Sequence, residues 1–323
     1  NNNMRLFKNL KKINFYIYIN KKFKKKKKLN LYIFVFLIII FGKITSLINF
    51  RLYYRFSKLI SFFISKDIIC KIKILNDTNF KFYLNDPYYN RLIYKDYHYE
   101  IEIENFLKKI DKINYVFFDA GANYGYWSSI VSSKKFGSHR AIAIEPVKKN
   151  FFMCKTNCNL NNSKFTLINK GISNIACTKN IYVDDSTSSA VGSSLLKPKN
   201  RLYKKEKINI IPITKILKRY KKFKYHVIKL DIEGEETNCL KTIKQNSHNK
   251  LLIIYEDHGS DKKNTPTRYL LKKGYKVFVG LENKFFKIKK YTDLDKYKKR
   301  KTVGYNFFAT TSKEFLNKLE NDS

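Results

Sequence analysis

The heptapeptide Asp119-Ala-Gly-Ala-Asn-Tyr-Gly125 is the stretch that decides the fold of this chain. It follows a short apolar run at residues 115–118 and precedes a segment with a helical pattern at residues 125–133. Gly121 and Gly125 allow a tight turn and a close approach of the backbone to a ligand, because neither carries a Cβ atom. Free N–H groups and the positive end of the helix dipole point to the same place. The stretch therefore predicts a strand, a ligand-binding turn and a helix.

On both sides of this turn, apolar strands alternate with helices. The predicted strands are residues 115–118, 141–144, 165–168, 227–230, 251–255, 275–279 and 305–310, and the predicted helices are residues 125–133, 148–160 and 267–273. Such alternation predicts a mostly parallel sheet with helices on both faces. We therefore expect an α/β, Rossmann-like domain at residues 111–311 with seven strands, and a C-terminal tail at residues 312–323. The polar, Ser-rich residues 184–207 are expected to form a loop over the sheet.

Residues 67–110 are expected to lead into this domain. Residues 70–75 and 80–84 alternate between apolar and polar side chains, and Asn76 and Asp77 between them favour a turn. This pattern predicts a β-hairpin. Residues 99–110 then show the spacing of an amphipathic helix.

The first 66 residues differ in composition from the rest. A basic run, Lys21 to Lys28, precedes an apolar run at residues 31–41. The apolar run is shorter than the roughly 20 residues that cross a bilayer, and extending it to residue 50 would place Lys43 inside. Three interpretations stay open: a helix packed on the domain, a membrane-surface anchor helped by the lysines, and a true span. We expect residues 1–66 to take no part in chemistry, and any membrane association to involve residues 21–50.

The formal net charge of the chain is +40. Such a charge attracts nucleic acid, anionic membranes or acidic substrates. However, the abundant Lys, Asn, Ile, Phe and Tyr residues share A/T-rich codons, and codon bias is the favoured explanation. The five cysteines form no Cys-x-x-Cys pair, which indicates reduced thiols in a cytoplasmic protein. Scattered cysteines and histidines also predict no metal site.

Two carboxylates mark the ends of the first two predicted strands of the domain. Asp119 ends the first strand, and Glu145, followed by Pro146, ends the second. An acidic residue about 20 positions after a glycine turn typically accepts hydrogen bonds from ribose hydroxyls. Asn123 stands where a dinucleotide-binding turn has glycine, which argues against a pyrophosphate here. We therefore expect a nucleoside ligand that lacks a pyrophosphate.

A second group of acidic residues follows the predicted strand at residues 227–230. Asp231 and Glu233 stand at its end, which borders the ligand crevice of an open α/β sheet. Lys229 shares a sheet face with Asp231 and is expected to hold it ionised. A carboxylate in this position is suited to act as a general base. The alternative is that these acids merely begin the next helix, where negative charge is favoured.

The predicted strand at residues 251–255 brings two further possibilities. Glu256 and Asp257 follow it, and with Asp231 they would form a group of three carboxylates suited to Mg²⁺. His258 is an alternative general base.

Four segments resemble the FkbM-type methyltransferase family. They are residues 117–126 (Phe-Phe-Asp-Ala-Gly-Ala-Asn-Tyr-Gly-Tyr), 143–146 (Ala-Ile-Glu-Pro), 157–161 (Asn-Cys-Asn-Leu-Asn) and 228–236 (Ile-Lys-Leu-Asp-Ile-Glu-Gly-Glu-Glu). The last segment fits the family's Lys-x-Asp-x-Glu-Gly-x-Glu pattern, with Glu235 where a small residue is more usual. The resemblance covers roughly residues 79–280.

This resemblance implies a class I methyltransferase fold and S-adenosyl-L-methionine as the cofactor. Asp119 would pair with the ammonium group of the cofactor and Glu145 with its ribose. The other expected cofactor-binding residues are Gly121, Asn123, Tyr124, Gly125 and Pro146; the expected catalytic residues are Asp231, Glu233 and Lys229. Characterised members methylate oxygen, so the expected acceptor is a hydroxyl of a sugar, glycan or other small molecule. Two alternatives are a methyltransferase acting on RNA or another polyanion, and a non-catalytic protein that retains the fold.

Overall fold

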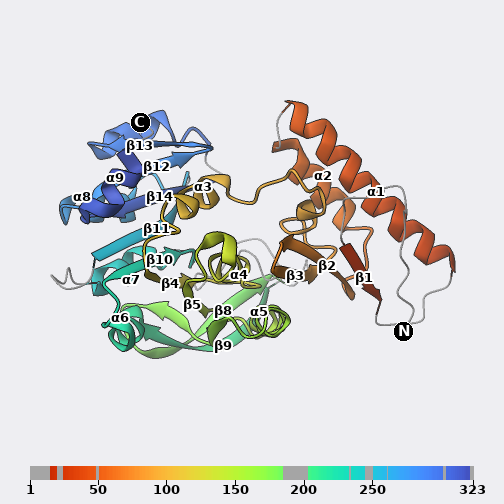
Figure 1. Cartoon of the computed structure of the whole chain (residues 1–323), viewed down its shortest axis with the longest axis horizontal. Coiled ribbons are helices and arrows are strands. Elements are labelled where there is room, and N and C mark those ends of the chain that lie inside the picture. Colours follow the sequence, from red (N-terminus) through yellow and green to blue (C-terminus); the bar gives the residue numbers. More distant parts are fainter. Residues whose placement is uncertain are drawn as a thin grey trace.

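A computed structural model describes residues 15–19, 25–48, 51–184, 203–232, 234–243, 250–259, 261–300 and 303–320. An N-terminal unit lies at one end of the long axis of the molecule, and an α/β domain fills the other end (Figure 1). The N-terminal unit contains β1 (Phe15–Ile19), α1 (Lys25–Ile48), α2 (Arg51–Ser61), β2 (Ile68–Leu75), β3 (Thr78–Tyr83) and the short helix η1 (Asn90–Ile93).

The described part of the α/β domain is built on an eight-stranded sheet in the order β13-β12-β14-β11-β10-β4-β5-β6. Its strands are β4 (Tyr115–Ala120), β5 (Arg140–Ile144), β6 (Phe165–Ile168), β10 (Tyr225–Leu230), β11 (Lys250–His258), β12 (Lys276–Leu281), β13 (Lys284–Ile288) and β14 (Gly304–Thr310). The central strands β6, β5, β4, β10 and β11 are parallel, whereas β14 runs antiparallel to β11 and β12. The predicted mostly parallel α/β sheet is confirmed. The sequence analysis missed β13, an eighth strand that forms an edge hairpin with β12.

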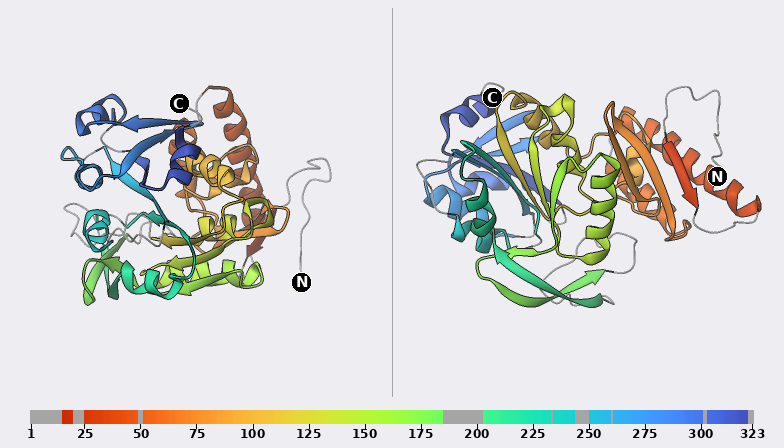
Figure 2. Two further views of the ribbon diagram at one scale, coloured as in Figure 1. Left: turned by 60° about the vertical axis from the view of Figure 1, so that its left-hand side comes forward. Right: turned by 60° about the horizontal axis from the view of Figure 1, so that its bottom comes forward.

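Helices cover both faces of this sheet, as predicted (Figure 2). One face carries α3 (Ile101–Lys109), α4 (Tyr126–Val131), α5 (Lys148–Leu160) and α9 (Lys313–Glu320), and the other carries α6 (Ile213–Leu217), α7 (Glu236–Thr242) and α8 (Thr265–Lys272). Side chains alternate between these two cores along each strand. In β4, Phe117 enters the first core and Phe118 the second. The expected tail at residues 312–323 includes α9, whose Phe315 and Leu319 are buried in the first core.

A second, three-stranded sheet in the order β7-β9-β8 was not predicted. It contains β7 (Gly171–Ser173), β8 (Cys177–Asp184) and β9 (Tyr203–Pro212). The expected loop at residues 184–207 is therefore wrong at both ends, and residues 185–202 lie outside the described residues. Residues 203–207 of β9 are largely exposed and rich in lysine, so they lack the apolar alternation that marks a half-buried strand.

The predicted hairpin is present as β2 and β3, and two asparagines attach it to α5. Asn157 Oδ1 accepts a hydrogen bond from the Lys81 N–H (2.7 Å), and Asn157 Nδ2 donates to the carbonyls of Lys81 and Tyr124 (both 2.9 Å). One turn later, Asn161 bonds the N–H (2.9 Å) and carbonyl (2.8 Å) of Asn79 in the same way. The two amides thus pair with the free edge of β3. Through its bond to the Tyr124 carbonyl, Asn157 also connects β3 to the turn after β4.

We expect Asn157→Ala to lower the free energy of unfolding by about 2 kcal/mol, because the buried carbonyl of Tyr124 and two part-buried backbone groups of Lys81 lose their partner. Urea unfolding of the purified protein measures this change. Asn159→Ala is the matched control, since Asn159 is exposed on the same helix. A similar loss in both variants would contradict the role given to Asn157.

The N-terminal helix α1 packs on its own unit through one side. Leu31, Val35 and Ile38 follow one another at helical spacing and are buried there. The first of the three interpretations expected α1 to pack on the domain, whereas its main contacts are with α2 and η1 of the N-terminal unit. Within the described ranges, no helix has the length and apolar character needed to cross a membrane. The lysines at positions 21–24 lie outside these ranges, while Lys25 begins α1.

Candidate active site

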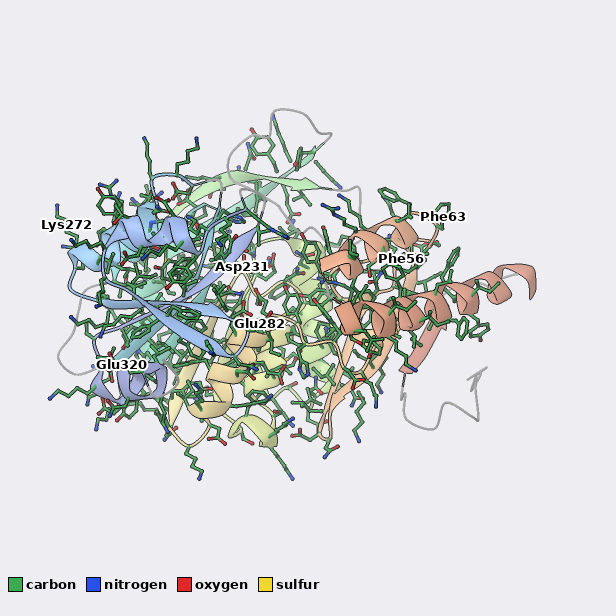
Figure 3. The ribbon with its side chains drawn as sticks, turned by 90° about the horizontal axis from the view of Figure 1, so that it is seen from above. Phe56, Phe63, Asp231, Lys272, Glu282 and Glu320 are labelled. Carbon is green, nitrogen blue, oxygen red and sulfur yellow. The ribbon has the colours of Figure 1, made fainter. Side chains whose placement is uncertain are left out.

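A cavity of about 450 Å³ lies at the carboxyl ends of β4, β5, β10 and β11. Its walls come from the turns after these strands, from the start of β14, and from the segment that joins η1 to α3. Asp231 lies near the middle of the molecule, between the sheet and the helical part that carries Phe56 and Phe63 (Figure 3). Ligands of open α/β sheets bind at this edge.

The turn after β4 is held tightly between two other strand ends. The Gly121 N–H donates to the carbonyl of Ile144 at the end of β5 (2.9 Å). On its other side, a Cβ atom at Gly121 would lie 1.8 Å from the carbonyl oxygen of Asp231. Gly121 also has φ +82°, which L side chains rarely adopt. Only glycine fits there, and the turn therefore lines the cavity with backbone.

Gly125 and Tyr124 do not line this cavity, although both were expected to bind the cofactor. A Cβ atom at Gly125 would lie 2.7 Å from Cys154 Sγ, so this glycine permits the packing of the turn on α5. Tyr124 is fully buried and stacks on Tyr89, with ring centroids 5.1 Å apart. The geometry of both residues is that of structural supports for the turn.

Asp119 reaches the cavity from the end of β4 and is almost fully buried. Its Oδ2 accepts hydrogen bonds from the N–H (3.1 Å) and the hydroxyl (2.8 Å) of Ser128, near the start of α4. Lys229 pairs with Asp119 in the register of β10 and β4, so both side chains emerge on the same face. Burial raises the pKa of the Asp119 carboxyl, while Lys229 and Ser128 oppose this rise.

Glu145 and Pro146, at the end of β5, both line the cavity. Glu145 accepts backbone hydrogen bonds from Asn123 N–H at Oε2 and from Val147 N–H at Oε1, both at 2.9 Å. Burial raises the pKa of Glu145 to about 8, although these two bonds oppose the rise. Asn123 also lines the cavity, and its buried Oδ1 has no hydrogen-bond partner among the described residues. This unpaired acceptor beside a carboxylate suits a nucleoside, which offers several hydroxyl and amino donors.

Lys229 and Asp231 form an ion pair at the end of β10. Lys229 Nζ lies 2.9 Å from Asp231 Oδ2, and the lysine is almost completely buried while the aspartate is partly open to the cavity. Burial works against the charge of Lys229, but Asp231, Glu100 and Asp119 together raise its pKa above the usual value. The lysine is therefore charged, and it neutralises part of a carboxylate cluster. Glu233, the third expected catalytic residue, lies outside the described residues.

The other acids of the 228–236 segment shape the turn after β10. Glu236 begins α7, and its carboxylate accepts the N–H groups of Ile232 (3.0 Å) and Gly234 (2.9 Å). Burial raises the pKa of Glu236 to about 7. This contact agrees with the alternative interpretation, in which some of these acidic residues stabilise the first turn of the next helix. Glu235 instead lines the cavity and accepts a hydrogen bond from Ser173.

Glu100 is a cavity residue that the sequence analysis missed. It precedes α3 and has φ +48°, an uncommon conformation for a non-glycine residue. Its carboxylate accepts hydrogen bonds from Trp127 Nε1 (2.7 Å) and Asn306 Nδ2 (3.3 Å), which come from distant parts of the chain. Burial raises its pKa to about 7, with Lys229 lowering and Asp231 raising it. Glu100 belongs to no local motif, so only the tertiary contacts bring it to the site.

Aromatic side chains form the cavity wall opposite the sheet. The guanidinium of Arg91 lies 4.7 Å from the ring centre of Tyr97 and 5.2 Å from that of Tyr54, and Tyr54 also contacts Tyr88 (5.1 Å). Tyr54 belongs to α2. Helix α2 therefore supplies part of the cavity wall, while the expectation that residues 1–66 take no part in chemistry stays a prediction.

The possible magnesium site of the sequence analysis does not assemble. Asp257 is bound to Lys298 Nζ (2.7 Å) and to the hydroxyl of Thr267 (2.9 Å), and it does not line the cavity. Across the described residues, no three His, Cys, Asp or Glu side chains converge as metal ligands. Glu256 and His258 do line the cavity, with His258 Nε2 3.3 Å from the Glu256 carboxylate.

Residues 119–277 match the protein family described as the methyltransferase FkbM domain. The chain carries a methyltransferase domain of the FkbM family. The match begins at Asp119 and spans the turn, Glu145 and the Lys229–Asp231 pair. The chain is accordingly a methyltransferase that uses S-adenosylmethionine, and the predictions of family, enzyme class and cofactor are confirmed. No curated protein sequence is significantly similar to this chain.

Solved structures with similarity to this chain include an FkbM methyltransferase from Methylobacillus flagellatus, at 18% sequence identity and a TM-score of 0.37. That similarity covers 61% of this chain and 44% of the other. A precorrin-6y C5,15-methyltransferase from Geobacter metallireducens matches at 14% identity and a TM-score of 0.36, covering 66% of this chain and 88% of the other. A SAM-dependent O-methyltransferase from Thermotoga maritima matches at 7% identity and a TM-score of 0.34, covering 66% of each chain. The fold assignment rests on the sheet topology of this chain itself.

We expect Gly121→Ala to weaken binding of S-adenosylmethionine at least about tenfold, because the new Cβ atom displaces the turn from Asp231. Calorimetric titration measures this affinity. Gly274→Ala is the matched control: Gly274 has nearly the same φ (+81°), yet a Cβ atom there meets nothing within 4 Å. Equal affinities in the two variants would contradict the proposed role of the turn.

The raised pKa of Glu145 predicts a pH dependence of stability. Between about pH 4.5 and about pH 8 the folded protein holds a proton on Glu145 that the unfolded chain has lost. Stability from this group is therefore present at low pH and falls as the pH rises through this window. We expect Glu145→Gln to flatten the decline, measured as the free energy of unfolding against pH. An identical slope in the variant would show that Glu145 titrates normally.

Proposed function

We propose that this methyltransferase transfers its methyl group to a hydroxyl of a neutral, polyhydroxylated acceptor such as a sugar or glycan. The observation that carries this proposal is the cavity itself, which joins a carboxylate at the end of β10 to an aromatic wall. The carboxylate is suited to take the hydroxyl proton, and the wall is suited to hold the acceptor.

The charges around the cavity favour an acceptor without phosphate groups. Its carboxylates outnumber its Lys and Arg side chains: it is lined by Glu100, Asp119, Glu145, Asp231, Glu235 and Glu256, against Arg91, Lys170 and Lys229. This balance is opposite to that of the chain, whose net charge is +40. Burial raises the pKa values of Glu100 and Glu145 to about 7 and about 8, so part of this set is protonated at neutral pH, and its ionised members repel a phosphate. The cavity therefore supports a neutral acceptor over RNA or another polyanion.

The aromatic wall supports a sugar in particular. Tyr54, Tyr88 and Tyr97 offer flat apolar faces with a hydroxyl at the edge of each ring. A sugar ring presents the matching surface, since its C–H groups form apolar patches and its hydroxyls point outward. Arg91 is held against Tyr54 and Tyr97 and carries donors for these hydroxyls.

S-adenosylmethionine, when bound, supplies a methyl group on a positively charged sulfur. Asp231 is placed to accept the proton of the acceptor hydroxyl as the oxygen–methyl bond forms and the sulfur–methyl bond breaks. Lys229 holds Asp231 in place and compensates its charge within the buried site. Because the transfer is a direct displacement, alignment of the acceptor by the cavity walls contributes much of the rate.

A panel assay tests the acceptor class. Methyl transfer from labelled S-adenosylmethionine to free sugars, oligosaccharides and RNA is measured in parallel. We expect label in the carbohydrate fractions. Label in RNA alone would overturn the proposed acceptor, although the enzyme class would stand.

We expect Asp231→Asn to lower the rate of transfer by about 10²–10⁴-fold, because the amide cannot accept the proton. Affinity for S-adenosylmethionine should change much less, and calorimetry on the same protein measures it. Asp96→Asn is the control, since Asp96 is exposed and lies outside the cavity. A preserved rate with weakened cofactor binding would make Asp231 a binding residue instead.

A further inference from the structure

The exposed side of α1 is mostly apolar, and α2 adds the exposed Leu52 and Leu59 beside its exposed basic residues, although both helices are already packed on their inner side. In α1 the buried residues Leu31, Val35 and Ile38 alternate at helical spacing with exposed residues such as Ile40 and Ile44 on the opposite side. A helix that is apolar all round is normally covered all round. On the outer side of α1, no other described residues cover the apolar side chains.

Exposed apolar side chains are concentrated on this part of the molecule. Among the described residues, thirteen large hydrophobic side chains are exposed, and nine of them lie in residues 33–63. We call these nine the outer apolar face: Ile33, Phe36, Ile40, Ile44, Leu47, Leu52, Leu59, Phe62 and Phe63. Contiguous apolar surface of this kind marks an interaction site.

The two helices present this face together. Phe41 of α1 stacks on Phe56 of α2, with ring centroids 3.8 Å apart, and Phe34 lies 6.3 Å from Phe63. These contacts place the helices side by side. Since the inner sides of both pack on the body of the unit, the outer sides face away from it. Figure 3 shows Phe63 at the border of the molecule and Phe56 deeper in the unit.

The charge of the same segment indicates what covers the face. Residues 1–66 contain sixteen Lys and Arg residues and no Asp or Glu, so that all 26 acidic residues of the chain follow residue 66. A bias toward A/T-rich codons accounts for lysine but not for the lack of acidic residues, which are frequent later in the chain. Lys43, Arg55 and Lys58 are exposed on the same two helices. An apolar face surrounded by uncompensated positive charge matches the headgroup region of an anionic bilayer.

We propose that α1 and α2 dock the enzyme on the surface of an anionic membrane, with the outer apolar face inserted among the lipids and the basic residues against their headgroups. The helices lie on the bilayer and do not cross it, in agreement with their length and polarity. Tyr54 of α2 lines the cavity, so the docked helix also forms a wall of the active site. The proposal does not depend on the acceptor, because its test measures binding alone.

Sedimentation of the full-length protein with lipid vesicles tests this proposal. We expect binding to vesicles of phosphatidylcholine with phosphatidylserine, much weaker binding to phosphatidylcholine alone, and partial release at high salt, which screens the lysines. Equal binding to both kinds of vesicle, or none to either, would overturn the proposal.

Variants locate the docking face. Ile40→Gln, Ile44→Gln and Phe62→Gln together should lower the vesicle partition coefficient at least about tenfold, because less apolar area enters the bilayer. Phe152→Gln with Ile175→Gln is the matched control, since these side chains are exposed to 63% and 58% on the α/β domain. Circular dichroism and the affinity for S-adenosylmethionine verify that each variant is folded. A similar loss of vesicle binding in the control would overturn the assignment.

Size-exclusion chromatography over a range of protein concentrations tests the alternative that a second copy of this chain covers the outer apolar face. We expect a monomer whose elution is the same in the wild type and in the Ile40, Ile44 and Phe62 variant. A dimer that this variant dissociates would show that the outer apolar face is a self-association interface, and the membrane proposal would fail.

Discussion

The ammonium group of Lys229 lies in the protein interior, where burial by itself would favour its neutral form. Asp231, Glu100 and Asp119 reverse this preference and raise its pKa. The dependence is mutual, because carboxylates this close together repel one another unless a positive charge lies among them. Removing one partner of such a buried cluster leaves the others uncompensated. The end of β10 thus holds the electrostatic balance of the site together with Asp231, the carboxylate that we propose as its general base.

The backbone around this charge is also tightly constrained. The turn after β4 lies between the ends of β5 and β10, with no room for a side chain at Gly121. Glu145 fixes the same turn by accepting the N–H of Asn123, and Glu236 fixes the turn after β10. Glu145 and Glu236 are buried carboxylates whose pKa values are raised to about 8 and about 7. The site therefore costs stability to maintain, which is common where binding requires a preformed geometry.

The N-terminal unit connects this site to the outside of the molecule. Its inner surface reaches the cavity through Tyr54, and its outer surface carries the exposed apolar side chains of α1 and α2. The hairpin of β2 and β3 joins this unit to α5 through Asn157 and Asn161. The cavity is thus lined by both parts of the chain.

The sequence alone determined the α/β fold, because local apolar runs and helical spacing already fix a parallel sheet and its covering helices. It also determined the position of Asp119, Gly121, Glu145, Lys229 and Asp231 at one edge, since parallel strands end together. The tertiary structure decided what the sequence pattern could not. Gly125 and Tyr124 belong to the same motif as Gly121 yet support packing, because the turn exposes only part of its length to the cavity.

Asp257 is adjacent to Glu256 in the chain, yet it pairs with Lys298, because successive residues of a strand point to opposite faces. Glu100 and Tyr54 reach the cavity from segments without a motif, and the first half of β9, residues 203–207, formed from residues without apolar alternation. These features depend on contacts between residues far apart in the sequence, which local patterns do not record. The sequence determined which elements form and where their ends meet; the tertiary structure decided which side chains face the cavity, because that depends on how distant segments pack against one another.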